Sequence, residues 1–365
     1  MRTDKKIVLF NNALTGGGGR YIVTLAKALK KKGIDVHIII YENKIDFELP
    51  ETLPLHLLKN HQGKKKSILH QLTQSIESLE PIDLIVSNSS PSNKILSQMK
   101  HPQAVHCIHS AETKEHHGLL APLKSLWREK KYRRLYNGKN LITVSQGLKS
   151  YILDDLKVNP TSICTIYNPF DFEEIQRASL ETFSEIPSEP YIVHVGRFDT
   201  VQKRHDILLQ AYSLANIPHK LVLVGKGKDR QLIKKWIQEY HLEKKVIMPG
   251  FQTNPYSWIA KADLLVSSSD FEGFGRTLVE ALILKTPVVS TDCPSGPSDI
   301  LTGELATYLS PPGDSEKLAK NINKALYGYP EIEDNFIEKF DSDIIADEYL
   351  KLADSYTIAH SQSRE

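Results

Sequence analysis

The sequence predicts an α/β protein made of two doubly wound parallel sheets, and three observations support this fold class. Short runs rich in β-branched residues alternate with amphipathic stretches along the chain. The runs are apolar throughout, as parallel strands covered by helices on both faces must be. The alternation breaks once, near residues 171–190, and a length of 365 residues favours two domains at roughly 100–200 residues each.

The first half of the chain has the strand and helix order of one doubly wound domain. Its β-branched runs predict strands at 7–10, 36–40, 84–86, 104–108 and 141–144. Amphipathic stretches between them predict helices, among them 21–32 and 67–79. We therefore assign residues 1–170 to an N-terminal domain.

A linker and a second domain follow. Residues 171–190 are acidic, contain proline and lack a strong apolar run, which is typical of a linker. Strands are then predicted at 191–195, 221–224, 246–248, 264–267 and 288–290. Helices are predicted at 205–216, 229–240, 255–260, 276–284 and 315–326. We assign residues 191–340 to the C-terminal domain, and a last helical pattern at 344–356 to a separate segment, 341–356.

Composition excludes several classes of protein. A net charge of +2 gives no general case for nucleic-acid binding. The three cysteines, Cys107, Cys164 and Cys293, are far apart and suit neither a disulfide framework nor a zinc site, which favours a reducing compartment. The apolar run at 7–10 is too short for a signal peptide, and no run reaches the ~18 residues of a membrane span. We expect a cytoplasmic protein that at most lies on a membrane surface.

Glycines 16–19 follow the first predicted strand and precede a predicted helix. Glycines let a ligand approach the backbone, and a helix N-terminus attracts negative charge, so we predict a loop that contacts a phosphate or a sugar. A dinucleotide fingerprint is an alternative, although Tyr21 occupies the place of its third glycine and Glu42 alone matches its ribose-binding acid. A simple tight turn is the other alternative.

Two cations stand near the start of the second half. Gly196 and Arg197 come directly after the strand at 191–195, and Lys203 follows six residues later. An arginine fork and a lysine point charge at the end of a strand could hold a diphosphate. A solvated loop with two ordinary surface cations is the alternative.

The segment 267–282 carries the strongest signal. Glu272 lies in a glycine-containing loop after a strand, and Glu280 lies in the helix that follows. Carboxylates suit pairs of sugar hydroxyls, and the first-turn amides of the helix, near Thr277 and Leu278, suit a phosphate.

Glu272 and Glu280, separated by seven residues, resemble the Glu-x7-Glu motif of retaining glycosyltransferases of family 4 with the GT-B fold. Arg197 and Lys203 stand where that family places its diphosphate-binding cations, and glycines 16–19 match its N-terminal loop. His109 is similar to the histidine that ends one of its N-terminal-domain strands. The resemblance extends over residues 5–356.

The resemblance implies two facing Rossmann-like domains with an interdomain cleft. The N-terminal domain would bind the acceptor, the C-terminal domain the nucleotide sugar, and the helix at 341–356 would cross back to the N-terminal domain. The implied catalytic residues are His109, Arg197, Lys203 and Glu272. The implied donor-binding residues are Gly17, Gly18, Gly196, Phe274, Gly275, Thr277, Leu278 and Glu280.

The same resemblance implies an activity. A sugar would pass, with retention, from a nucleotide-diphosphate donor to a hydroxyl of a glycan or glycolipid acceptor. UDP-sugars are the family's commonest donors. The strings STDCPSGP and TIYNPF are similar to those of a subset that acts on lipopolysaccharide cores and lipid-linked saccharides. No metal or cofactor is expected, because Arg197 and Lys203 would supply the positive charge.

Other functions remain open. A sugar-nucleotide epimerase would use the same donor without an acceptor. A non-catalytic protein that binds sugar nucleotides would need no stabilised leaving group, and an NAD oxidoreductase would bind a dinucleotide instead. Dependence of turnover on an acceptor separates the first alternative from a transferase.

A basic stretch lies at 122–137, where apolar residues alternate with cations. Such a helix can dock on an anionic membrane, or it can be a solvated helix that packs on its own domain. The cations that would make the membrane contact are Lys124, Arg128, Lys130, Lys131, Arg133 and Arg134. Docking would place the protein at the inner face of the cytoplasmic membrane.

Overall fold

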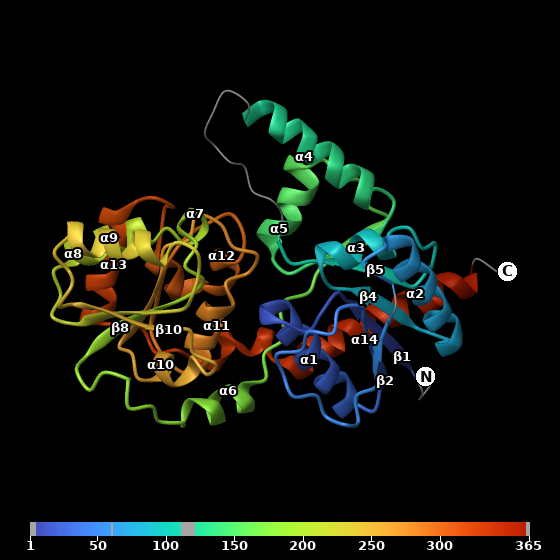
Figure 1. Ribbon diagram of the computed structural model, residues 1–365, viewed down its shortest axis with the longest axis horizontal. Helices are drawn as coiled ribbons and strands as arrows, with labels where there is room; N and C mark the ends of the chain where they lie inside the picture. Colours follow the sequence, from blue (N-terminus) through green and yellow to red (C-terminus); the bar gives the residue numbers. More distant parts are fainter. Residues whose placement is uncertain (1–4, 60, 111–120, 363–365) are drawn as a thin grey trace. The chain divides into compact units, whose positions relative to one another are not determined.

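The computed structural model describes residues 5–59, 61–110 and 121–362. The chain divides into two compact units. The first contains residues 1–170 together with residues 340–365, and the second contains residues 171–339 (Figure 1). Each unit has its own parallel sheet, which confirms the predicted class of two doubly wound α/β domains.

The first unit is built on a seven-stranded sheet with the order β3-β2-β1-β4-β5-β6-β7. All its strand pairs are parallel. The strands are β1 (Lys6–Asn11), β2 (Asp35–Ile40), β3 (Leu55–Leu57), β4 (Leu84–Ser87), β5 (Ala104–Ile108), β6 (Asn140–Thr143) and β7 (Ser162–Thr165). The direction of winding reverses between β1 and β4, and ligands of open α/β sheets bind at the carboxyl ends of strands at such a point.

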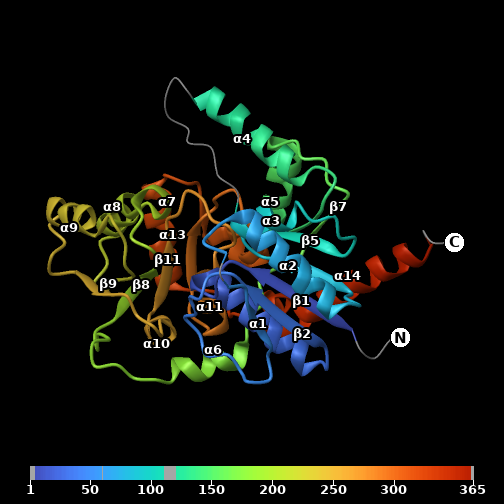
Figure 2. The same ribbon diagram turned by 45° about the vertical axis from the view of Figure 1, so that its right-hand side comes forward.

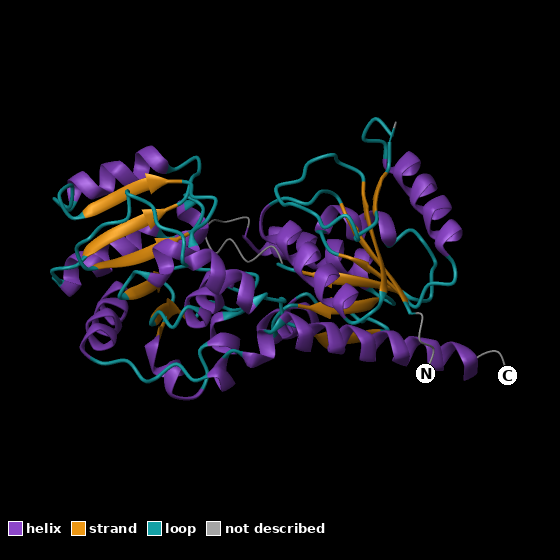
Figure 3. Ribbon diagram, turned by 90° about the horizontal axis from the view of Figure 1, so that it is seen from below, coloured by secondary structure: helices purple, strands orange, loops and turns teal. Residues whose placement is uncertain are grey.

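Helices cover both faces of this sheet (Figure 3). They are α1 (Gly16–Lys31), α2 (Lys65–Leu79), α3 (Ser90–Leu96), α4 (Ala121–Tyr136), α5 (Gln146–Ser150), the π-helix η1 (Tyr151–Asp155) and α14 (Ser342–Gln362). The last of these lies beside α1 in both Figure 1 and Figure 2, and the side chains of Tyr21 and Tyr349 meet between the two helices. The C-terminal helix is therefore part of the core of the first unit.

The second unit repeats the architecture with a six-stranded sheet, in the order β10-β9-β8-β11-β12-β13. The strands are β8 (Tyr191–Val195), β9 (Lys220–Val224), β10 (Val246–Gly250), β11 (Leu264–Ser267), β12 (Val288–Thr291) and β13 (Leu309–Ser310). The direction of winding reverses between β8 and β11. Side chains of both strands, including Ile192 and Val266, lie in one buried apolar cluster.

The helices of the second unit flank its sheet and connect its strands. They are α6 (Phe172–Ser179), α7 (Thr200–Lys203), α8 (His205–Ala215), α9 (Arg230–Glu239), α10 (Tyr256–Ala260), α11 (Arg276–Ile283), α12 (Pro297–Ile300) and α13 (Ser315–Tyr327). Short 3-10 turns occur at Gly303–Tyr308, Asp334–Phe336 and Glu338–Phe340, the last of which ends at the first residue of the returning segment.

The structure differs from the sequence prediction at three short strands, β3, β7 and β13. Each contains only two to four residues and lies at the edge of its sheet, and among all their residues only Ser310 is buried. Such strands need no continuous apolar run, so the pattern that predicts the central strands does not mark them.

Residues 171–190, predicted to be a linker, contain helix α6. Asp171 accepts a hydrogen bond from the amide of Glu174 and so caps the helix, and Ile175 is buried. The side-chain amide of Asn254 donates to the carbonyl of Ala178 at the end of α6 (2.7 Å). One capped turn and one buried side chain therefore attach the start of this segment to the second unit.

Glycines 16–19, predicted to form a loop, are the first turn of α1. Gly16 adopts a positive φ of +56°, where the helix begins. A Cβ on Gly19 would lie 2.4 Å from the backbone carbon of Leu14, so only glycine fits where the incoming chain crosses the helix. The glycines thus allow a helix to start close to the strand that precedes it.

Candidate functional site

The two predicted cations of the second unit follow β8. Arg197 is exposed, and its guanidinium donates to the side-chain oxygen of Gln202 (2.6 Å). Gln202 in turn donates to the carbonyl of Phe271 (3.2 Å), so it links the loop after β8 to the loop after β11. Asp199 caps the short helix α7, which ends at Lys203. The fold therefore brings both cations to the carboxyl edge of the sheet.

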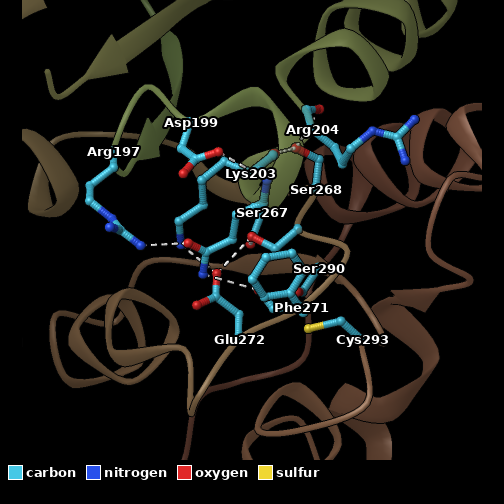
Figure 4. A network of polar contacts seen from close by, with 12 residues as sticks. Arg197, Asp199, Lys203, Arg204, Ser267, Ser268, Phe271, Glu272, Ser290 and Cys293 are labelled. Atoms are coloured by element: carbon cyan, nitrogen blue, oxygen red, sulfur yellow. Dashed lines mark hydrogen bonds and ion pairs between the residues drawn. The ribbon is translucent and has the colours of Figure 1, made fainter. Parts of the chain in front are cut away.

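Lys203 and Glu272 form an ion pair at this edge (Figure 4). Their side chains are only 13% and 10% exposed, which makes the pair far less screened by water than a surface pair. The hydroxyl of Ser269 donates to the same carboxylate oxygen, Oε1 of Glu272 (2.7 Å). One carboxylate thus binds an ammonium group and a hydroxyl at the edge of the sheet.

The main chain around Lys203 is tied to the loop after β11. The buried Ser268 hydroxyl donates to the carbonyls of Lys203 (2.7 Å) and Arg204 (3.1 Å). Arg204 adopts a left-handed conformation (φ +46°) and donates to Asp206 and to Asp270 (2.6 Å). These contacts fix the main chain at Lys203 against the loop that carries Glu272.

The loop 272–275 is closely packed against the segment after β12. The Ser295 hydroxyl donates to the carbonyl of Glu272. A Cβ on Gly296 would lie 1.8 Å from the carbonyl oxygen of Phe274, and Gly296 also has a positive φ of +101°. Gly275, with φ +94°, is the N-cap of α11. The loop therefore depends on glycine within it, at Gly275, and on glycine in the segment packed against it, at Gly296.

Helix α11 carries the second predicted carboxylate. Glu280 is 6% exposed, and its Oε1 lies 3.7 Å from Nε of Arg276, one turn earlier. Thr277 is partly exposed, but Leu278 is buried and its amide donates to the carbonyl of Gly275 (3.0 Å). The Leu278 amide, expected to donate to a phosphate, is therefore used within the first turn of the helix.

Two buried histidines, His194 and His205, lie near Lys203. Nδ1 of His194 donates to the carbonyl of Val266 (2.9 Å), and its ring packs edge-on against that of His205. Burial lowers the pKa of His194 to about 4 and that of His205 to about 2, so both rings are neutral at pH 7. A Cβ on Gly196 would lie 3.1 Å from Nε2 of His194 and 3.3 Å from Cε of Lys203, so a larger residue would crowd both side chains.

The predicted residues of the first unit meet at its switch point. His109 follows β5, Asn88 follows β4, and Gly18 lies in the first turn of α1, as does Gly17. Nε2 of His109 is hydrogen-bonded to Oδ1 of Asn88, and Nδ2 of Asn88 donates to the carbonyl of Gly18 (3.3 Å). The fold thus connects His109 to the glycine segment through Asn88.

Buried side chains of α1, β5 and α14 lie next to His109. The Tyr21 ring packs edge-on against the His109 imidazole, with ring centres 4.6 Å apart. The Tyr21 hydroxyl is hydrogen-bonded to that of Tyr349, and the Cys107 thiol lies 3.8 Å from it. Burial raises the pKa of both tyrosines, which remain protonated at pH 7. Helix α14 therefore contributes to the support of His109.

The basic stretch forms most of α4, but one of its cations is not on the surface. Arg128 is 7% exposed and donates to the hydroxyl of Tyr151 (3.1 Å), so it faces the unit interior beside the buried Tyr132 and Tyr136. Exposed instead are Leu126, Trp127, Lys130, Arg133 and Arg134, with Lys131 partly exposed. Lys124 lies outside the residues whose side chains the structure describes. The inclusion of Arg128 in the membrane contact was wrong, because helical periodicity turns positions 128, 132 and 136 inward.

Several residues at these sites were not predicted. Gln202, Ser268, Ser269 and Arg204 connect the cations to the carboxylate, and Asn88 connects His109 to Gly18. Of these, only the run of three serines at 267–269, at the end of a predicted strand, offers a local signal in the sequence. The other residue types are too common in loops to be singled out.

Two further features bear on the chemistry. Within the described ranges, no helix is long and apolar enough to cross a membrane. Over the same residues, no three side chains of His, Cys, Asp or Glu come together as a metal-binding group would require.

Two family models match this chain, one in each half. The family model described as "Glycosyltransferase Family 4" matches residues 15–174, and the model described as "Glycosyl transferases group 1" matches residues 177–341. The two matches adjoin at the boundary between the two units.

A curated relative and two solved structures show the same similarity. An N-acetylgalactosamine-N,N'-diacetylbacillosaminyl-diphospho-undecaprenol 4-alpha-N-acetylgalactosaminyltransferase of Campylobacter jejuni is 28% identical over 81% of this chain and 83% of its own. A lipopolysaccharide outer core galactosyltransferase has a TM-score of 0.71 at 20% identity, over 96% of this chain and 99% of its own. An Anabaena protein solved with UDP and glucose has a TM-score of 0.68 at 19% identity, over 99% of this chain and 100% of its own.

Proposed function

We propose that this chain, a hexosyltransferase with the GT-B fold, moves a sugar, with retention, from a UDP-sugar to a hydroxyl of a lipid-linked or other cell-envelope saccharide. The donor is supported by the Anabaena structure that contains UDP and glucose. The acceptor is supported by the Campylobacter relative, whose name specifies an undecaprenol-linked substrate, and by the lipopolysaccharide galactosyltransferase.

One observation carries the proposal. Arg197, Lys203 and Glu272 follow the carboxyl ends of β8 and β11, where ligands of such sheets bind. Glu280 lies in the second turn of α11, the helix that starts just after Glu272. Negative charge develops on the leaving nucleoside diphosphate as the glycosidic bond breaks. Arg197 and Lys203 would stabilise that charge without a metal ion, because two cations can supply the positive charge that a divalent ion otherwise would.

The carboxylates have separate roles in the proposal. Glu280, nearly buried in α11, would accept hydrogen bonds from the ribose hydroxyls. Glu272 would accept them from the donor sugar, after its partner Lys203 turns toward the diphosphate. The ribose and the donor sugar would both bind beside the loop that is shaped by Phe274, Gly275 and Thr277. In the first unit, His109 would contact the transferred sugar. Gly17 and Gly18 would lie near the phosphates of the donor.

A screen of donors and acceptors tests the proposal. UDP- and GDP-sugars are incubated with the protein, with chelator or with divalent metal, and with or without undecaprenyl-diphosphate-linked saccharides. Mass spectrometry follows nucleoside diphosphate release and product mass, and NMR of the product gives its anomeric configuration. We expect release that needs the acceptor, survives chelation and yields the donor's configuration.

Three variants separate the outcomes. Glu272→Ala and Arg197→Ala should lose turnover, and Arg177→Ala, an exposed arginine of α6, should not. Isomerised donor in the absence of acceptor would instead identify an epimerase. Binding of a sugar nucleotide without turnover under any condition would leave a non-catalytic protein.

We also propose that α4 attaches the protein to the inner face of the cytoplasmic membrane. Trp127 is 67% exposed and Leu126 stands beside it, with Lys130, Arg133 and Arg134 on the same surface of the helix. Tryptophan favours the headgroup region, and the cations favour anionic lipid. This surface would bring the enzyme to a lipid-linked acceptor.

A further inference from the structure

The hydrogen bonds around Asn88 determine which way its amide points. Asn88 is 2% exposed. Its main-chain N–H donates to the carbonyl of Phe10 (3.0 Å), and this hydrogen bond holds the main chain of Asn88 against β1. The Gly18 carbonyl can only accept a hydrogen bond, so the group that faces it must be the side-chain NH2 of Asn88 (3.3 Å). The side-chain oxygen, Oδ1, is then the atom that faces His109.

The orientation of Asn88 determines the proton position on His109. Because Oδ1 of Asn88 can only accept, Nε2 of His109 must carry the hydrogen that lies between them. In a neutral imidazole this leaves the lone pair on Nδ1. The opposite tautomer would set two lone pairs against each other and would leave the side-chain oxygen of the buried Asn88 without this hydrogen bond.

The neighbouring thiol agrees with this assignment. Sγ of Cys107 lies 3.4 Å from Nε2 of His109 and 3.8 Å from the hydroxyl oxygen of Tyr21. Burial raises the pKa of the Cys107 thiol to about 12, so the sulfur keeps its proton at pH 7. A thiol that donates toward Tyr21 presents a sulfur lone pair to the imidazole, which again suits a protonated Nε2.

A 180° rotation of the His109 ring would place Cε1 where Nε2 now faces Asn88 and would lose this hydrogen bond. The Tyr21 ring packs edge-on against the His109 ring at 4.6 Å between centres, and Tyr21 is itself held by the hydroxyl of Tyr349. Both tyrosines are fully buried. The position of the imidazole is therefore fixed by α1 and α14, and its proton by Asn88.

We propose that Asn88 is a positioning residue that, oriented by the Gly18 carbonyl, holds His109 as the Nε2–H tautomer. In this tautomer Nδ1 carries the lone pair and can only accept a hydrogen bond. A contact between His109 and the transferred sugar rests on the proposed function, whereas the tautomer does not.

Imidazole NMR of the full chain, labelled with 15N in its histidines, tests the tautomer directly. The His109 signals are identified by their loss in His109→Gln. In the wild type at neutral pH, Nε2 should be the protonated nitrogen. Asn88→Ala should give averaged signals of both tautomers, and Asn88→Asp, which keeps an acceptor, should again show a protonated Nε2. Asn321→Ala, which removes a buried asparagine of the second unit, is the matched control and should leave the His109 signals unchanged.

A wild-type His109 protonated on Nδ1 alone would overturn the proposal, even if no Asn88 variant folds. An Asn88→Ala protein with an unchanged His109 tautomer would overturn it as well. The kinetic consequence is separate: kcat should fall about tenfold in Asn88→Ala, the equivalent of one lost hydrogen bond, with binding of UDP alone unchanged. Full turnover in His109→Gln would contradict the proposed role of His109 in transfer and would leave the tautomer result standing.

Discussion

The ammonium of Lys203 and the carboxylate of Glu272 are bound to each other, although the sequence motifs assign one to the diphosphate and the other to the sugar. The pair joins α7 to the loop after β11, across a separation of 69 residues. The two groups that would divide the donor between them therefore satisfy one another in this structure. Donor binding would exchange their mutual contact for contacts with the ligand.

The first prediction concerns the stability of this pair. Lys203→Met and Glu272→Gln should each destabilise the second unit, because each leaves a nearly buried partner uncompensated. The double variant should lose less than the sum, with a coupling of about 1–3 kcal/mol. The coupling is measured by unfolding each variant in urea and monitoring tryptophan fluorescence, since Trp236 and Trp258 lie in this unit.

The exposed pair of Lys235 and Glu239 on α9 is the control for this cycle. Its side chains are well exposed, so its coupling should be no more than about 0.5 kcal/mol. Equal coupling energies for the two pairs would show that the contact between Lys203 and Glu272 has no special strength.

The second prediction concerns Arg197. Arg197→Ala should lower kcat about 10²–10³-fold, the cost of removing one preorganised donor from a developing negative charge. Gln202→Ala should cost less, because Gln202 only orients the guanidinium through its hydrogen bond. Steady-state assays with the donor found in the screen measure both, beside Arg177→Ala. A kcat for Arg197→Ala within twofold of wild type would remove the residue from the mechanism.

The third prediction concerns pH and His194. Its pKa is about 4 in the folded state and about 6.5 in the unfolded state, so the unfolded chain binds more protons between these values. Stability from this residue is therefore complete above about pH 6.5 and declines as the pH falls toward 4. Between about pH 7.5 and pH 5 the loss should be about 2 kcal/mol.

Unfolding in urea at both pH values measures this loss. His194→Gln should make the second unit less sensitive to pH by that amount, whatever its effect on stability at neutral pH. His70→Gln, which changes an exposed histidine of α2, should leave the pH dependence as in wild type. Identical pH dependence in wild type and His194→Gln would contradict the neutral, buried state of His194.

The fourth prediction concerns the loop 272–275. Gly296→Ala should destabilise the second unit by more than about 1 kcal/mol and weaken UDP binding, because its Cβ meets the carbonyl of Phe274 and its φ is positive. Gly328→Ala is the matched control, since it has open space and an extended backbone. Thermal unfolding and calorimetric titration with UDP measure the two effects. A Gly296→Ala protein with wild-type stability and affinity would show that this packing is not needed.

The fifth prediction concerns α4. Charge reversal of Arg133 and Arg134 to glutamate should weaken binding to vesicles that contain anionic lipid by about thirtyfold or more at low salt, since each surface cation contributes about 1 kcal/mol. Trp127→Ser should weaken binding at high salt as well, because it removes apolar insertion. Charge reversal of Lys234 and Lys235 on α9 is the control. Vesicle binding that is unaffected by the changes in α4 would identify it as a solvated helix.

The central strands could be predicted from the sequence because their burial leaves a continuous local pattern. The strand Tyr191–Val195 and the strand Leu264–Ser267 were predicted with their observed bounds. The strand Ser162–Thr165 was not, because its place near the outside of the sheet leaves it partly exposed and without an apolar run. The side of a helix is harder to predict when both sides contain charges, which is why Arg128 was placed on the surface.

The sequence by itself determined the two-domain α/β class and the chemical types at the edge of the second sheet, because strand periodicity and the spacing of Glu272 and Glu280 are local properties. Only the tertiary structure decided that Lys203 binds Glu272, that Asn88 lies between Gly18 and His109, and that Tyr349 supports Tyr21. Lys203 and Glu272 are 69 residues apart in the sequence, Gly18 and Asn88 are 70 apart, and Tyr21 and Tyr349 are 328 apart. Their meeting depends on strand order and helix packing across the whole unit, and no short stretch of sequence encodes that order.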